Sequence, residues 1–177
     1  VLSCADHPAY LKRLGEPRVT TLKEKSHPDS WRDELEAIRP QIREDESANA
    51  MERMVIAATR EIISRVKQKK YRTLLAGIGA SNLAAWMATY LLRQEGYEID
   101  VMAEIGLFGY LPRPADPFIF NLSNIPTCKM LTDIPEVLGL LMSGETQCCL
   151  GALSAAQVDR FGNLNSTIVP PNLFITG

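Results

Sequence analysis

The chain has 177 residues, and 46% of them are hydrophobic, which suffices for one packed core and is little for two. Its formal net charge is −2, so it lacks the basic surface expected of a nucleic-acid-binding protein. Every apolar run is far shorter than the roughly 18 residues that a membrane span needs. These properties predict a protein that binds neither nucleic acid nor membrane.

The four cysteines lack the spacing of a metal or redox site. Cys4, Cys128, Cys148 and Cys149 contain no C-x-x-C pair. Cys148 and Cys149 are adjacent, and neighbouring side chains on a strand point to opposite faces, so the two are poorly placed to hold one ion. We therefore expect free thiols, no metal and a cytoplasmic location.

Residues 1–48 are dense in charge, sparse in apolar residues and broken by prolines. We predict a charged N-terminal arm or linker, with a short helix at 29–38 that ends before Pro40. A connector from a preceding domain is the alternative. The chain begins with Val1 and ends within an apolar pattern, so we expect residues 49–177 to belong to a domain that continues further.

From Asn49 onward, the pattern changes to alternating helices and strands. Asn49 and Glu52 fit a capping box at the start of a helix. A buried strand at 73–78, a helix that ends near Gly96 and a strand at 98–103 follow, which fits a βαβ unit. The predicted apolar faces consist of Met51, Met54, Val55, Ala58, Ile62 and Val66 in the first helix, and of Leu83, Trp86, Met87, Tyr90 and Leu91 in the second.

The second half of the chain continues the alternation. We predict a short strand at 117–122, a helix from about 135 to 143 capped by Asp133, and a buried strand at 146–153. Together these elements predict an α/β domain with an open, mostly parallel sheet flanked by helices.

Polar groups or glycines follow three of the predicted strands. "GIGASN", with Gly77 and Gly79, ends one strand and opens a helix, where backbone N–H groups can meet an anion. It matches neither the dinucleotide fingerprint nor the Walker loop, because Asn82 replaces the third glycine and no Gly-Lys-Ser follows. By itself, a tight turn without a ligand explains this segment as well as a contact with phosphate or acyl-CoA does.

"AEIGLFGYLPRP" places an acid, Glu104, just beyond a strand, where open parallel sheets form their sites. A carboxylate there can transfer a proton or attack a carbonyl carbon, and Gly106 and Gly109 leave room for a substrate. From the pattern alone, a structural acid that caps the turn or pairs with an arginine such as Arg113 is the stronger interpretation.

"LGALSAAQVDRFGNLNST" runs from a predicted buried strand into a dense polar turn around Gly162. Spacing alone favours a hairpin-like turn in which Asp159 and Asn163 satisfy backbone groups.

These three segments, in this order, resemble class I coenzyme A transferases, in the B (beta) subunit or C-terminal half typical of glutaconate and 3-oxoacid CoA-transferases. "GIGASN" is similar to the family's "LGIG" turn, and "AEIGLFGYLP" to its "SENGxxGxxP" segment, although Ile105 stands where the family often has asparagine. The third segment resembles G-A-x-Q-V-D-x-x-G-N-x-N, with matches at Gln157, Val158, Asp159, Gly162, Asn163 and Asn165. The resemblance spans roughly residues 50–177.

The resemblance implies a CoA transferase with the corresponding fold, in which Glu104 is the nucleophile. Glu104 would attack an acyl-CoA to give a mixed anhydride and then a glutamyl-CoA thioester, which a second carboxylate resolves with ping-pong kinetics. CoA and substrate contacts are implied at Gly77, Gly79, Gly106, Gly109, Gln157 and Asn163. No cofactor is implied beyond the CoA thioester as substrate, and an A-type subunit or domain would complete a hetero-oligomer.

Two alternatives remain open at this point. One relative of the family keeps the scaffold, binds CoA esters and hydrolyses a carbon–carbon bond. Related sheets also serve as ligand-sensing or regulatory modules without catalysis, because a fold alone does not fix a function.

Overall fold

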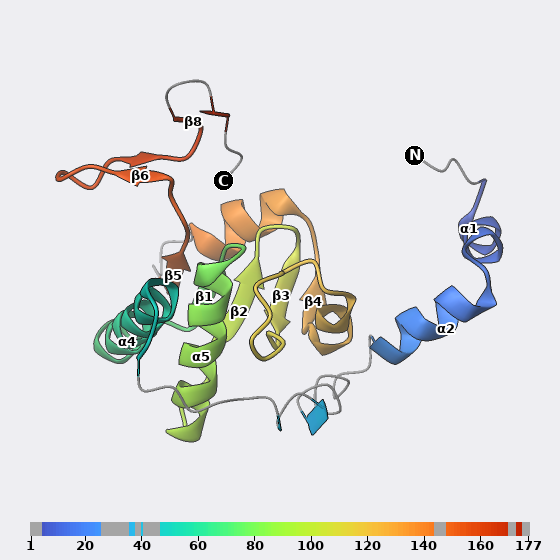
Figure 1. Ribbon diagram of the computed structural model, residues 1–177, viewed down its shortest axis with the longest axis horizontal. Helices are drawn as coiled ribbons and strands as arrows, with labels where there is room; N and C mark the ends of the chain where they lie inside the picture. The colour runs from blue at the N-terminus through green and yellow to red at the C-terminus, as the bar shows by residue number, and fades with distance from the viewer. Residues whose placement is uncertain are drawn as a thin grey trace.

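The computed structural model describes residues 5–25, 36–37, 40, 47–143, 148–169 and 173–174. Its centre is a five-stranded sheet with helices on both faces (Figure 1). The strands are β1 (Thr73–Ala76), β2 (Asp100–Ala103), β3 (Leu107–Tyr110), β4 (Met130–Leu131) and β5 (Cys149–Ala152), in the spatial order β4-β3-β2-β1-β5.

The sheet is mixed but mostly parallel. β1 pairs in parallel with both β2 and β5, whereas β3 pairs antiparallel with β2 and with β4. Of the five strands, β3 alone therefore runs against the others. The predicted α/β class with an open, mostly parallel sheet is confirmed.

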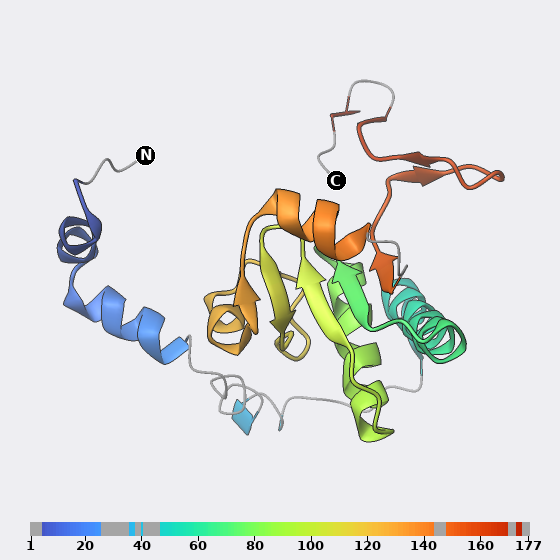
Figure 2. The same cartoon turned by 180° about the vertical axis from the view of Figure 1, so that it is seen from behind.

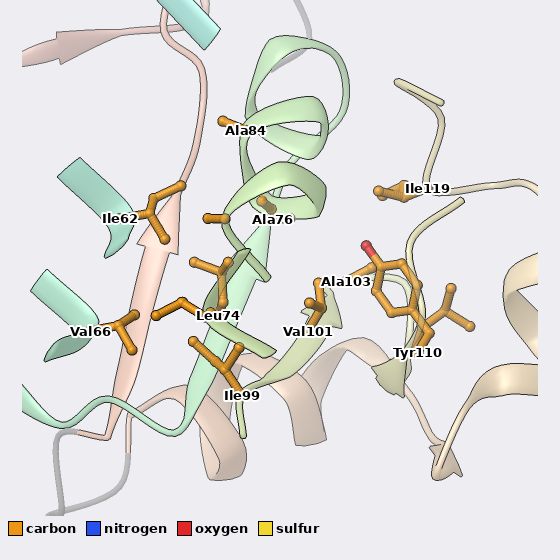
Figure 3. Close-up of a cluster of buried hydrophobic side chains, with 14 of the residues drawn as sticks. Ile62, Val66, Leu74, Ala76, Ala84, Ile99, Val101, Ala103, Tyr110 and Ile119 are labelled. Carbon is orange, nitrogen blue, oxygen red and sulfur yellow. The ribbon is translucent and has the colours of Figure 1, made fainter. Parts of the chain in front are cut away.

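Two helices, α4 (Ala50–Lys69) and α5 (Ala80–Gln94), pack together and cover one face of the sheet. Figure 3 shows Leu74 and Ala76 of β1 and Val101 and Ala103 of β2 in this layer, which also buries Tyr110. The alternate strand residues, Leu75 and Met102, point to the opposite face and contact Val137 of η3 (Glu136–Met142). This alternation buries consecutive strand residues on both sides, as expected for a sheet between two helical layers.

The start of α4 follows the prediction closely. The Asn49 side chain accepts a hydrogen bond from the Glu52 N–H at 3.0 Å, and the Glu52 carboxylate accepts one from the Asn49 N–H at 2.8 Å. Val55, Ile62 and Val66 are buried as predicted, but Met51 and Met54 are exposed. The apolar face of α4 therefore contacts the sheet from its second turn onward.

The predicted inward face of α5 is wrong. The residues buried in α5 are mainly small: Ser81, Asn82, Ala84, Ala85, Ala88, Thr89 and Leu92. Leu83, Trp86 and Met87 are half-buried, and Tyr90 and Leu91 are exposed. The alanine face lets the helix axis approach the sheet closely, which turns the larger side chains outward.

Residues 117–122 do not form the predicted strand. They form a turn that leads into the 3-10 helix η2 (Leu122–Thr127), with Ile119 buried and Phe118 and Phe120 exposed. The Asp116 carboxylate holds the turn by accepting hydrogen bonds from the Phe118 N–H at 2.8 Å and from Asn121 Nδ2 at 2.6 Å. The apolar alternation that suggested a strand therefore has no neighbouring strand to pair with in the described structure.

The predicted helix near 135–143 is present, wound as the π-helix η3. Asp133 caps it, since its carboxylate accepts a hydrogen bond from the Glu136 N–H at 2.9 Å. The strand predicted at 146–153 is β5, which lies at an edge of the described sheet and is only partly buried. Cys128, Cys148 and Cys149 are free thiols, as predicted, and Cys4 lies outside the described residues.

The N-terminal segment forms α1 (His7–Leu14) and α2 (Glu16–Lys25), which extend away from the sheet (Figure 2). Asp6 caps α1 by accepting a hydrogen bond from the Ala9 N–H at 2.8 Å. Most of the helix predicted at 29–38 lies outside the described residues. In the described part of the chain, none of the helices has the length and hydropathy of a membrane span.

After β5, the chain forms two small antiparallel pairs, β6 (Gln157–Val158) with β7 (Leu164–Asn165) and β8 (Ile168–Val169) with β9 (Leu173–Phe174). Figures 1 and 2 both show the β6–β7 hairpin projecting outward from the side of the sheet that ends in β5.

Candidate active site

Glu104 directly follows the last residue of β2, as the sequence predicted for a site at the end of a strand. The chain then turns through Ile105 and Gly106 into β3, and the Gly106 N–H donates to the Ala103 carbonyl at 3.1 Å. A backbone hydrogen bond therefore closes this turn. Ile105 packs against the main core cluster, so its side chain helps to hold the turn in place.

One oxygen of the Glu104 carboxylate is buried without a hydrogen bond. Its Oε2 atom is buried and accepts no hydrogen bond from any described residue, while the residue as a whole is partly exposed. Buried polar atoms are nearly always paired, and an unpaired one destabilises the fold by about 1–3 kcal/mol. Among the described residues, this oxygen therefore has no structural partner.

A buried polar network joins the end of β3 to the start of α5. The Tyr110 hydroxyl donates to Asn82 Oδ1 at 3.2 Å, and Asn82 Nδ2 donates to the Asp116 carbonyl at 2.8 Å. Tyr110 and Asn82 are almost completely buried. Burial raises the pKa of Tyr110, and the negative charge of Glu104 raises it further. The phenol therefore stays protonated at neutral pH.

Sequence reasoning did not identify this network. Asn82 was considered only as the residue that breaks a glycine motif, and its bond to Tyr110 was not foreseen. Their hydrogen bond joins the first turn of α5 to the end of β3, 28 residues further along the chain. A polar residue in the first turn of an otherwise apolar buried helix was the available signal.

The alkaline stability of the protein tests the environment of Tyr110. An unfolded tyrosine ionises near pH 10, whereas the raised pKa keeps Tyr110 protonated in the fold, so stability is lost as pH rises above about 10. We expect the free energy of unfolding of the wild type to exceed that of Tyr110→Phe below pH 10. The difference should narrow by about 1 kcal/mol per pH unit above pH 10. A difference that stays constant up to pH 11 in urea titrations would contradict the assignment.

Two of the predicted site glycines have a structural reason to be glycine. At Gly106, where φ is +103°, an added Cβ would lie 2.1 Å from the Thr132 carbonyl oxygen. At Gly109, where φ is +67°, it would lie 2.8 Å from side-chain atoms of Lys129. The positive φ and the close neighbouring atoms explain why both positions are glycine. No contact with a substrate is needed to account for them.

Gly77 and Gly79 lie between β1 and α5. A Cβ at Gly77 would lie 3.2 Å from Ser81 Oγ, whereas one at Gly79 would meet no atom within 4 Å. Gly79 has a φ of +85°, donates its N–H to the Pro117 carbonyl at 2.8 Å and caps α5 without a side-chain hydrogen bond. At Gly79 the positive φ, and not a close neighbour, is therefore what favours glycine.

Gln157 and Asn163 lie in the β6–β7 hairpin, which projects away from the sheet (Figure 1). Asn163 donates its N–H to Asp159 Oδ1 at 2.9 Å and its Nδ2 to Asp159 Oδ2 at 2.7 Å, while Asn165 Nδ2 donates to Gln157 Oε1 at 2.7 Å. The hairpin-like turn expected from spacing is confirmed. The structure does not gather these residues around Glu104.

Acid titration tests the Asp159 turn. Hydrogen bonds from Asn163 and from backbone N–H groups lower the pKa of Asp159. The ionised carboxylate thus stabilises the turn above about pH 3.9, and this stabilisation is lost as pH falls through the lowered pKa of Asp159. We expect the amide NMR signals of Phe161 and Asn163 to titrate below pH 3.9, and not in Asp159→Asn. Titration at or above that pH would contradict this assignment.

Comparison with known proteins identifies the fold. No sequence profile of a known family matches the chain, and no curated protein matches it in sequence. Among solved structures, it is similar to glutaconate coenzyme A-transferase from Acidaminococcus fermentans, with a TM-score of 0.50 and 20% sequence identity. The match covers 67% of this chain and 48% of that one, so this chain spans about half the length of that protein. The chain therefore has the fold of a coenzyme A-transferase.

Proposed function

We propose that the chain is the part of a CoA transferase that carries the nucleophile, and that Glu104 is this nucleophile. The observation that carries the proposal is the buried, unpartnered Oε2 of a glutamate placed at the carboxyl end of β2. Structural similarity to a glutaconate CoA-transferase supports the reaction class. The sequence resemblance of the segment around Glu104 supports the role of this residue.

A carboxylate suits this chemistry better than a hydroxyl does. Attack on an acyl-CoA gives a mixed anhydride and free CoA thiolate, and attack of that thiolate on the glutamyl carbon gives a glutamyl-CoA thioester and a free acid. An acceptor carboxylate reverses both steps and leaves as the new acyl-CoA. Because anhydride and thioester are both reactive, the energy of the original thioester is retained, whereas a serine ester would be too stable to pass the group on.

The remaining site residues are assigned roles around Glu104. Gly77 and Gly79 form the turn between β1 and α5, and backbone N–H groups at the start of that helix would contact the CoA or an acyl oxygen. Gly106 lies in the turn that presents Glu104, and Gly109 lies in the strand that follows it. Gln157 and Asn163, in the projecting hairpin, would reach CoA only in an assembled site, so we assign the missing part of the pocket to an A-type subunit or domain.

Initial-rate kinetics test this function. The complete protein, with its A-type partner, would be assayed with acetyl-CoA as donor and glutaconate as acceptor, each varied at several concentrations of the other. Ping-pong transfer gives parallel lines in double-reciprocal plots. Glu104→Gln should abolish transfer, whereas the matched control Glu98→Gln, at an exposed acid just before β2, should retain it.

Two results would contradict the proposal. Transfer that survives Glu104→Gln would show that another group is the nucleophile. Loss of the thioester at the same rate with and without an acceptor acid would indicate a hydrolase on the same scaffold.

A further inference from the structure

The segment between β3 and η2 is tied to the start of α5. Residues 113–121, here called the strap, make two hydrogen bonds to the first residues of that helix and its cap. The Gly79 N–H donates to the Pro117 carbonyl at 2.8 Å, and Asn82 Nδ2 donates to the Asp116 carbonyl at 2.8 Å. The strap is therefore held against the turn that joins β1 to α5.

This turn and Glu104 lie at the same edge of the sheet. β1 and β2 pair in parallel, with Leu75 opposite Met102. Gly77 and Glu104 each stand two residues beyond this pair, directly after the two strands. Because paired strands lie about 4.8 Å apart, the turn that binds the strap is the immediate neighbour of the turn that carries Glu104.

A contact within the core brings the strap to Glu104 from a second direction. Ile119 of the strap belongs to the same buried cluster as Ala103, the residue before Glu104 (Figure 3). Ile105, the residue after Glu104, packs against this cluster as well. The strap therefore shares its packing with both residues that flank the carboxylate.

Phe118 is an exposed aromatic residue on this fixed segment. It follows Pro117 directly, and its N–H donates to Asp116 Oδ1 at 2.8 Å, while Asn121 Nδ2 donates to Asp116 Oδ2 at 2.6 Å. The backbone of Phe118 is thus held by the fold, although the residue is 60% exposed. A phenyl ring held in water in this way gains free energy when an apolar part of a ligand covers it.

The acyl chain of a thioester is the part of the substrate that suits this ring. Attack requires the thioester carbon to lie within about 3.5 Å of a carboxylate oxygen of Glu104. The acyl chain and the sulfur of CoA extend from that carbon on different sides. Backbone N–H groups at a helix start suit the polar CoA, whereas an aromatic ring suits the hydrocarbon of the acyl chain.

We propose that Phe118 contacts the acyl chain of the bound acyl-CoA, and that the site prefers thioesters whose apolar acyl chain is longer than acetyl. This proposal rests on the proposed function. Phe118 is a specificity-determining residue in it, because the bonds that form and break all lie at Glu104 and the thioester. The strap supplies the wall that measures the acyl group.

The length of the donor acyl chain tests this role. The complete protein, with its A-type partner, would transfer CoA from acetyl-CoA, butyryl-CoA or hexanoyl-CoA to glutaconate. We expect kcat/KM of the wild type to be at least about tenfold higher for butyryl-CoA than for acetyl-CoA. Phe118→Ala should lower kcat/KM for butyryl-CoA about tenfold and change that for acetyl-CoA by less than about twofold.

Two further variants serve as controls. Phe118→Leu keeps an apolar side chain and should retain most of the preference for butyryl-CoA. Tyr90→Ala removes an equally exposed ring, 56% exposed, about 15 Å along the axis of α5 from Ala80. Its ratio of kcat/KM between the donors should equal that of the wild type.

The remaining results separate this proposal from the proposed function. An equal fall of kcat/KM for all three donors in Phe118→Ala would place the ring against CoA and overturn the acyl assignment. An unchanged ratio between the donors would overturn it too. The wild type would still transfer CoA in both cases, so the proposed function would stand. Absence of transfer by the wild type from every donor would overturn the proposed function itself.

Discussion

Glu104→Met is expected to abolish CoA transfer and, at the same time, to stabilise the fold. Loss of the nucleophile should lower kcat/KM by at least about 1,000-fold. Methionine has a similar length and no oxygen that needs a partner, so it removes the unpaired buried Oε2. We expect the free energy of unfolding to rise by about 1 kcal/mol, measured by urea titration.

The exposed Glu98 provides the matched control. Glu98→Met should change stability by less than about 0.5 kcal/mol and leave transfer intact. A Glu104→Met protein that is less stable than the wild type would indicate that this carboxylate is a structural acid. A stable but inactive variant would instead show that the fold tolerates an unfavourable group for the sake of its chemistry.

Gly106→Ala is expected to destabilise the protein by about 4 kcal/mol. The new Cβ would lie 2.1 Å from the Thr132 carbonyl oxygen, which is backbone and cannot rotate aside, and φ is +103°. Relief of this clash would break the 2.8 Å hydrogen bond from the Thr132 N–H to the Gly106 carbonyl, and with it the pairing of β3 and β4. The turn that presents Glu104 would move as well, so activity should fall even where the variant folds.

Gly139→Ala is the control for this prediction. Gly139 lies inside η3, has no positive φ, and an added Cβ would meet no atom within 4 Å. Alanine there should leave stability unchanged or raise it by up to about 1 kcal/mol. Equal urea midpoints for Gly106→Ala and the wild type would contradict the described packing of the β2–β3 turn.

Local signals in the sequence were sufficient to predict much of the fold. The capping box at Asn49, the buried strands around Leu74 and Val101, and the cap at Asp133 all depend on neighbouring residues. The errors depend on tertiary packing. The face of α5 was wrong because the alanines pack closely on the sheet, and 117–122 was wrong because no strand lies beside it in the described structure.

The candidate site was predicted only in part, for a related reason. The pattern placed Glu104 at a strand end, and the order of three segments suggested its role. Burial of one carboxylate oxygen, and the contact between Tyr110 and Asn82, arise only when β2, β3 and α5 pack together. Conversely, Gly106 and Gly109 match the resemblance and yet have a reason within the fold, so their matches alone carry little weight as evidence of binding.

Chemical trapping of Glu104 tests the central claim most directly. The complete protein would be incubated with acetyl-CoA, treated with borohydride and digested, and its peptides analysed by mass spectrometry. Borohydride reduces a thioester to an alcohol and leaves a free carboxylate unchanged. The account predicts that Glu104 is converted to the alcohol only when acetyl-CoA is present. Transfer activity with Glu104 unmodified, or with another acid reduced in its place, would contradict it.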